Sequence, residues 1–202
     1  MKIRTIATAL CTTLALAMPI AAQQAAQPNA APAQPSQAEM EAMMKAMSPG
    51  ENHKHLNRSV GDWTTVMKVF PGPGQPPMES TGTMHSEWIL DGRYVQSVYK
   101  GSMMGMPFEG RGVDGYDNMS KQYVSTWIDN MGTGIMYSTG TCDAGCKTLT
   151  TSGDMIDPMS GQKMTIRFVV TYPDDKTFVL NMYGKDASGT ETPMMEMTAK
   201  KK

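Results

Sequence analysis

The sequence predicts an all-β protein, an antiparallel up-and-down β-barrel of about ten strands preceded by a short N-terminal helix. After Trp63 the chain consists almost wholly of short strand-like runs. Segments with turn-forming residues separate these runs, and no helical pattern comes between them. An open meander of that length would expose a long strand edge, so closure into a barrel is favoured.

The N-terminus has the pattern of a secretory signal peptide over residues 1–22. Lys2 and Arg4 precede an apolar run, and Ala22 ends a small-residue cleavage site. We therefore expect an exported protein, periplasmic or secreted, cleaved after Ala22. The apolar run is too short for a membrane span, and no later segment approaches about twenty apolar residues.

Residues 23–37 contain mainly Ala, Gln and Pro and predict a disordered linker. Residues 38–60 predict a helical segment, whose methionines at helical spacing form one apolar stripe: Met40, Met43, Met44 and Met47. We expect this stripe to pack against its own domain. A binding surface or a copper(I) site are the alternatives, since thioethers suit both.

The barrel domain is expected over residues 61–202. Its predicted strands are 63–70, 78–90, 93–100, 107–116, 122–129, 134–142, 146–154, 162–172, 177–184 and 190–200. A barrel of this size has room inside for side chains and one small ligand.

The central hairpin, residues 108–129, carries most of the candidate binding residues. Along its first strand Phe108 and every second residue to Tyr116 share one face, and neither face is wholly apolar. Charged and aromatic side chains of this kind suit a cavity that is partly polar and partly apolar. We take five as candidate ligand-binding residues: Trp88, Glu109, Arg111, Trp127 and Asp129. The alternative is a cross-strand Glu-Arg pair beside a core tryptophan.

Cys142 and Cys146 are the only cysteines left after signal cleavage. The residues between them end in Gly145, which suits a type I turn closed by a left-handed glycine. Such a turn would set the cysteines across the neck of a hairpin, and an oxidising compartment then favours a disulfide. A redox or metal pair is the alternative, although zinc would need two further ligands and no nearby His supplies them.

Charge and motifs argue against several functional classes. Signal cleavage takes Lys2 and Arg4 from the 18 basic residues, leaving 16 against 19 acidic ones, which disfavours nucleic acid as a partner. The sequence has no nucleophile elbow, phosphate loop, dinucleotide fingerprint or zinc spacing. His85 shares a strand face with Glu87, a spacing common by chance. An enzyme is therefore not expected, and we assign no catalytic residue, metal ligand or cofactor.

Two resemblances follow from motifs. Gly61-Asp62-Trp63 after a short helical turn resembles the opening of the calycin superfamily, which includes the lipocalins, where the Trp closes the base of the barrel. Lipocalins often place an Arg from the last strand against this Trp, and here Lys200 or Lys201 stands in its place.

From about Glu39 onward the chain is similar to the bacterial family of domain of unknown function 1579, which implies a calycin-like barrel without an established activity. Cys142 and Cys146 depart from the usual pattern of that family. The resemblance rests on the runs Pro49-Gly50-Glu51-Asn52-His53-Lys54, Glu87-Trp88-Ile89-Leu90-Asp91-Gly92-Arg93, Pro107-Phe108-Glu109-Gly110-Arg111-Gly112, Gly115-Tyr116-Asp117-Asn118, Ser125-Thr126-Trp127-Ile128-Asp129, Met131-Gly132-Thr133-Gly134 and Asp157-Pro158-Met159-Ser160-Gly161.

Two functions from different classes remain open, with a third beside them. The first is a barrel whose cavity holds a small amphipathic or lipid-like ligand. The second is a copper(I) protein, suggested by 22 Met, by His53-Lys54-His55, and by the clusters 103–106 and 194–197. The third is a filled barrel that acts through contacts with a protein partner.

Overall fold

The computed structural model describes residues 34–72, 74–157, 160–185 and 189–202. The expected signal peptide, 1–22, and the linker up to residue 33 lie outside the described residues. Within the described ranges no helix combines the length and the hydropathy needed to cross a membrane.

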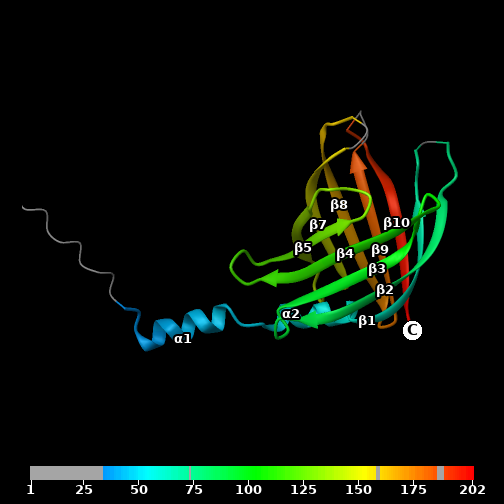
Figure 1. Cartoon of the computed structure of the whole chain (residues 1–202). Helices are drawn as coiled ribbons and strands as arrows, with labels where there is room; N and C mark the ends of the chain where they lie inside the picture. Colours follow the sequence, from blue (N-terminus) through cyan, green and yellow to red (C-terminus); the bar gives the residue numbers. More distant parts are fainter. Residues whose placement is uncertain (1–33, 73, 158–159, 186–188) are drawn as a thin grey trace, which may run out of the picture. The chain divides into compact units, whose positions relative to one another are not determined.

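Ten antiparallel strands form a closed barrel in the described part of the chain, so the predicted fold class is confirmed (Figure 1). Each strand pairs with the next along the chain, and β10 closes the barrel against β1. The strands are β1 (Gly61–Val69), β2 (Met78–Ile89), β3 (Tyr94–Met103), β4 (Met106–Asp117), β5 (Gln122–Asp129), β6 (Met136–Cys142), β7 (Thr148–Ile156), β8 (Lys163–Asp174), β9 (Thr177–Lys185) and β10 (Glu191–Lys201).

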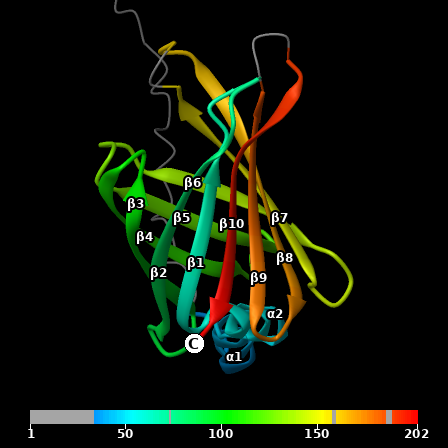
Figure 2. The same ribbon diagram turned by 90° about the vertical axis from the view of Figure 1, so that its right-hand side faces the viewer.

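Two short helical elements, α2 (Glu51–His55) and η1 (Leu56–Ser59), lead directly into β1 and lie at one end of the barrel (Figure 2). We call this end the floor and the opposite end the mouth. Because the strands alternate in direction, odd-numbered strands run from floor to mouth and even-numbered strands return. Residues near the start of β5 and near the end of β4 therefore lie together at the floor.

Helix α1 (Gln37–Ala46) buries none of its residues. The predicted stripe is present, but Met40, Met43, Met44 and Met47 are 44–68% exposed, so it does not pack against the barrel as expected. The contact recorded at the end of this helix is polar: Asn118 Nδ2 donates to the carbonyl oxygens of Ala46 and Ser48, each at 2.8 Å. The methionines are thus left facing solvent.

Trp63 closes the base of the barrel, as the calycin resemblance implies. It is 1% exposed, donates from Nε1 to the carbonyl oxygen of Ser59 at 2.9 Å, and packs edge-on against Phe178. Of the two candidate lysines, Lys201 pairs in register with Trp63, and its Nζ lies 5.3 Å from the ring centroid. Gly61 makes this possible, since its φ is +128° and a Cβ there would meet Lys201 Cε.

The main core lies on one side of the barrel interior. Its buried residues come from β1 to β4, β9 and β10: Trp63, Met67, Met84, Tyr99, Phe108, Phe178, Met197 and Ala199. A second cluster at the floor consists of Leu56, Val95, Tyr123 and Cys146. On the opposite wall, formed by β5 to β8, many inward side chains stay partly exposed, so the interior is not uniformly filled.

Candidate functional site

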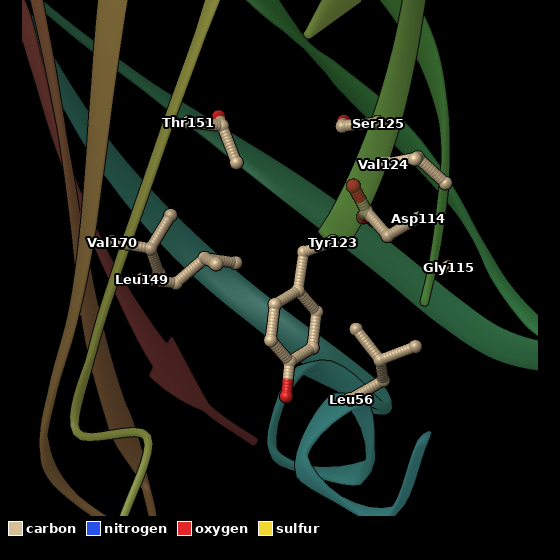
Figure 3. A pocket seen from close by; sticks show the side chains of 9 residues that line it. All are labelled: Leu56, Asp114, Gly115, Tyr123, Val124, Ser125, Leu149, Thr151 and Val170. Atoms are coloured by element: carbon tan, nitrogen blue, oxygen red, sulfur yellow. The ribbon is translucent and has the colours of Figure 1, made fainter. Parts of the chain in front are cut away.

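A small cavity of about 60 Å³ lies at the floor of the barrel beside η1. Its apolar side chains come from η1, β5, β7 and β8, and Asp114 and Ser125 bring polar groups to it (Figure 3). Figure 3 shows Asp114 and Leu149 pointing into the same space, with Tyr123 and Leu56 beneath. The lining residues are Leu56, Asp114, Gly115, Tyr123, Val124, Ser125, Leu149, Thr151 and Val170.

A row of polar side chains crosses the inner wall above this floor. The strand registers pair Asp114 with Ser125 and Ser125 with Ser138. Ser138 Oγ then donates to Thr151 Oγ1 at 3.2 Å, and both of these residues are buried. We call these four residues the polar row. It runs over β4, β5, β6 and β7 at one level of the barrel.

Asp114 is the ionisable member of the polar row. Burial raises the pKa of its carboxyl group, and a hydrogen bond with Ser125 offsets part of that rise. The side chain keeps some exposure because it borders the cavity, yet protein surrounds it. Burial also raises the pKa of Tyr172 on β8, and the nearby charge of Asp114 adds to the effect.

The helical elements α2 and η1, residues 51–59, together form what we call the plug at the floor of the barrel. Hydrogen bonds join the plug to the hairpin between β6 and β7. Arg58 donates to the carbonyl oxygens of Cys146 and Gly145, at 2.5 and 3.3 Å, and lies 5.6 Å from the centre of the Tyr172 ring. Tyr123 donates from its hydroxyl to the carbonyl oxygen of Asn52 at 3.2 Å. These contacts fix the bottom of the cavity.

His53 is a structural part of the plug. It is 6% exposed, accepts from the Gly50 amide at Nδ1 over 3.0 Å, and contacts the edge of Tyr116. Burial lowers its pKa, with a further contribution from Arg93. The imidazole is therefore neutral near pH 7 and has one ring nitrogen already bonded.

Cys142 and Cys146 lie at disulfide distance, with their Cα atoms 4.9 Å apart. Gly145 is left-handed, with φ of +81°, as the turn pattern predicts. The expected position across the hairpin neck is wrong, however, because Cys142 pairs in register with Leu149. Cys146 lies within the turn, with φ of +51°, and its side chain is buried in the floor cluster.

Three of the five candidate ligand-binding residues lie on the inner face. Trp88 is near the floor, where its Nε1 donates to Asn57 Oδ1 at 3.1 Å. Trp127 and Asp129 lie toward the mouth, and Trp127 Nε1 donates to Asp129 Oδ2 at 2.9 Å. The indole of Trp127 covers Gly110, where an added Cβ would overlap the ring. Gly110 and Gly112 of β4 thus allow the indole to lie close against the strand.

The other two candidates, Glu109 and Arg111, alternate with the inward residues of β4 and lie on its outer face. Arg111 Nη2 is 3.1 Å from Glu109 Oε1, and Lys100 Nζ is 3.9 Å from Glu109 Oε2. The Glu-Arg pair lies within one strand, so it is not the cross-strand pair of the alternative; Lys100 on β3 lies opposite Glu109, and the cluster is an exposed ion-pair group outside the lumen. The structure therefore does not bring all five candidates together.

The inner wall above the polar row is apolar and partly exposed. Its side chains come from β5 to β9, and several are methionines: Trp127, Met136, Met155, Met164, Phe168 and Met182. Toward the mouth, Met164 and Met194 both lie over Gly184, where an added Cβ would meet Met194 Sδ and Met164 Cε. The inner wall is therefore polar at the level of the polar row and apolar toward the mouth.

A larger, open groove of about 280 Å³ lies against the outer face of β1 to β3. There His85 Nδ1 is 2.8 Å from Asp62 Oδ1, and Nε2 is 4.0 Å from Glu87 Oε2. All three side chains are more than half exposed, so water solvates their charges. Within the described residues no three His, Cys, Asp or Glu side chains gather as a metal site would require.

Sequence reasoning missed Asp114, Ser125, Tyr172 and Arg58 as residues of one site. The alternation did place Asp114 and Ser125 on the faces that turn out to be inward. Arg58 and Tyr172 gave no local signal, since they meet only when the barrel closes. The one indication of this site in the sequence was an acidic residue, Asp114, on the same strand face as Phe108.

Comparisons with solved structures support the barrel fold. The chain is similar to Rv2717c from M. tuberculosis, with a TM-score of 0.58 and 8% identity, over 77% of this chain and 99% of that one. A redesigned β barrel matches with a TM-score of 0.36 and 17% identity, over 74% of this chain and 94% of that one. EF1p2_mFAP2b, solved bound to DFHBI, matches with a TM-score of 0.37 and 13% identity, over 74% and 98%.

At these identities the comparison with Rv2717c concerns the fold alone, and the other two scores are too low to support an argument. No curated protein matches the sequence. A family model, by contrast, matches residues 48–201, which span the plug and all ten strands of the barrel. The chain belongs to the family described as "Protein of unknown function (DUF1579)".

Proposed function

We propose that this chain is an exported barrel protein that binds a small amphipathic ligand in its lumen. The observation that carries the proposal is the division of the inner wall into a polar row beside the floor cavity and an apolar, partly exposed wall above it. Ligand pockets in proteins commonly combine apolar walls with a few converging polar groups. The polar row supplies such groups, and the wall above it supplies the apolar surface.

The wall suits a flexible hydrocarbon chain. Methionine side chains are unbranched and polarizable, so they adapt to ligands of different shape. Met155 and Met164 face each other in register on β7 and β8, and Trp127 adds a flat aromatic surface. In this proposal Trp88, Trp127 and Asp129 belong to the lumen. Glu109 and Arg111 lie outside it and serve as control positions.

Export is part of the proposal. It is supported by the signal-like pattern of residues 1–22 and by two cysteines at disulfide distance. Mass spectrometry of the protein from its native cell tests this point. We expect a chain that begins at Gln23 and is two hydrogens lighter than the fully reduced form, whereas an uncleaved, reduced chain would contradict export.

The binding test uses N-phenyl-1-naphthylamine, a neutral lipophilic dye whose fluorescence rises in apolar surroundings. We expect saturable binding by the wild-type chain. Ser125→Leu fills the floor cavity and is expected to weaken binding by about tenfold or more, in proportion to the lost contacts. Thr126→Leu makes a similar change one residue along, on the outer face, and leaves binding unchanged.

Both variants are first compared with the wild-type chain by circular dichroism and thermal unfolding. Equal loss of binding in the two folded variants would contradict a lumen site. Dye binding that is absent in the wild-type chain, and not restored by delipidation, would contradict the proposed function itself.

Copper(I) binding is the second candidate. The observation that favours it is the pair Met164 and Met194, which converge over Gly184 with thioether groups of the kind copper(I) prefers. His53, from the His53-Lys54-His55 run that also suggested copper, already has one ring nitrogen bonded. Calorimetric titration with copper(I) under reducing conditions tests the idea. Saturable binding that Met194→Leu abolishes would favour it, and no heat above dilution would remove it.

A protein partner is the third candidate, and the exposed methionines of α1 favour it. Deleting residues 38–47 separates this function from the lumen. If dye binding is unchanged by the deletion while a co-purifying protein is lost, helix α1 serves a partner and the lumen a ligand. If no protein co-purifies with either form, this candidate is removed.

A further inference from the structure

We infer that Asp114 anchors the head group of the ligand, and that the lumen selects amphiphiles whose head group is a protonated amine. The inference rests on the function proposed above and adds the chemical class of the ligand.

The position of Asp114 is the first step. Its carboxyl group projects from the inner face of β4 into the floor cavity, beside Ser125 and above Tyr123 (Figure 3). Liquid water occupies about 30 Å³ per molecule, and a primary ammonium group is of similar size. The cavity of about 60 Å³ therefore has room for such a head group. An attached alkyl chain would then extend along the apolar wall.

The missing counter-ion is the second step. Among the described residues no basic side chain acts on the charge of Asp114, whose pKa responds to burial and to the hydrogen bond with Ser125. Arg58 of the plug is engaged by the carbonyl oxygens of Cys146 and Gly145, and Lys54 is paired with Glu51. A buried carboxylate without a cationic partner is costly, so a cationic ligand is the complement this site lacks.

The remaining groups around Asp114 are compatible with a cation. Tyr123 and Tyr172 are held neutral, since burial raises the pKa of both phenols. An aromatic ring near an ammonium group adds cation–π attraction. A carboxylate head group would instead place two like charges together. An alcohol would gain a hydrogen bond to Asp114 without the added attraction of opposite charges.

The test compares decylamine, decanol and decanoate as competitors of N-phenyl-1-naphthylamine, each below its aggregation limit at pH 7.5. The three share one alkyl chain, so differences report the head group. Decylamine adds the attraction of opposite charges to its hydrogen bond with the Asp114 carboxylate, and decanol does not. We therefore expect decylamine to compete at least about tenfold better than decanol, and decanoate to be weakest.

Asp114→Asn keeps the shape of the side chain and removes its charge. It is expected to erase the preference for decylamine while leaving the affinity for decanol within about twofold, since the apolar contacts are unchanged. Glu109→Gln is the matched control, because it removes a carboxylate charge from the outer face of the same strand, where Arg111 and Lys100 lie beside it. It should leave the preference intact.

The pH dependence of the affinity for decylamine gives a further readout. The amine binds the ionised carboxylate, so the affinity for decylamine should fall as the pH drops toward the raised pKa of Asp114, while that for decanol stays constant. Loss of the preference in Glu109→Gln, with Asp114→Asn unaffected, would overturn the assignment.

The failures of the two proposals are distinguishable. Equal competition by all three compounds in the wild-type chain would refute amine selection and leave lumen binding standing. No dye binding and no competition by any compound would refute both. The head-group series needs no variant, so it tests the inference even if Asp114→Asn does not fold.

Discussion

Replacing Asp114 with asparagine is expected to stabilise the folded chain at neutral pH. Burying an ion costs several kcal/mol, and a hydrogen bond to a charged group returns about 1.5 to 3 kcal/mol. Asp114 has such a bond with Ser125 and partial access to the cavity, which limit the net cost. We expect the free energy of unfolding to rise by about 1 to 2 kcal/mol in the variant.

The pH dependence of folding stability gives the sign of the Asp114 contribution independently. Burial raises the pKa of Asp114 in the folded chain above its value in the unfolded chain. Between these two values the folded chain binds more protons than the unfolded one, so stability falls as pH rises through this window. The destabilisation is complete above the folded pKa and absent below the unfolded pKa. Asp114→Asn should remove this fall.

Urea unfolding of the wild-type chain and the variant, followed by circular dichroism from pH 4 to pH 8, measures both effects. Asp154→Asn is the control, because the pKa of Asp154 is lowered by bonds to Lys163 and Thr165. Its contribution has the opposite sign: it is present above the unfolded pKa and is lost as pH falls. A less stable Asp114→Asn with an unchanged pH slope would refute the account of an unpaired carboxyl.

Three further predictions follow from particular contacts. Gly110→Val places a side chain within the indole of Trp127, so it should destabilise the fold by about 2 to 3 kcal/mol and alter tryptophan emission; an unchanged spectrum would contradict the packing. Replacing Cys142 and Cys146 by serine should cost about 2 kcal/mol under oxidising conditions and nothing against the reduced wild-type chain, as measured by urea unfolding. Lys201→Ala should lower the free energy of unfolding by about 1 kcal/mol, because it removes the cation–π contact with Trp63. The contact would be contradicted if this loss were the same at high salt and if Lys201→Arg lost as much stability as Lys201→Ala.

The strand pattern was largely predictable from the sequence because turn chemistry marks the strand ends. The predicted strand 122–129 coincides with β5, since Asp117 and its neighbours form a polar turn before it. Asp117 Oδ1 accepts from the Met119 amide at 2.8 Å, a local bond that the sequence encodes. Local signals of this kind need no knowledge of the barrel.

The inward face of each strand was harder to predict. Along β4 the alternation separates Phe108 and Asp114 from Glu109 and Arg111, but neither set is wholly apolar. Sequence reasoning named Glu109 and Arg111 as candidate ligand contacts because charged and aromatic side chains together suit a partly polar cavity, with a cross-strand Glu-Arg pair as the alternative. The strand register decides otherwise, since Trp127 lies opposite Gly112 on the inner face.

The candidate site itself depends on contacts that are distant in sequence. The charge of Asp114 on β4 raises the pKa of Tyr172 on β8, and Arg58 reaches the β6–β7 hairpin. No periodic pattern reports such pairs. Likewise, helical spacing predicts the Met40 to Met47 stripe but not whether a surface is available to cover it.

Nuclear magnetic resonance titration of the mature chain with decylamine tests most directly whether the ligand site is the floor of the lumen. If the ligand binds there, saturable amide shift changes centre on the polar row, at Asp114, Ser125, Ser138 and Thr151, with smaller changes along the apolar wall. Shift changes confined to helix α1, or to the outer groove around His85, would contradict a ligand site in the lumen.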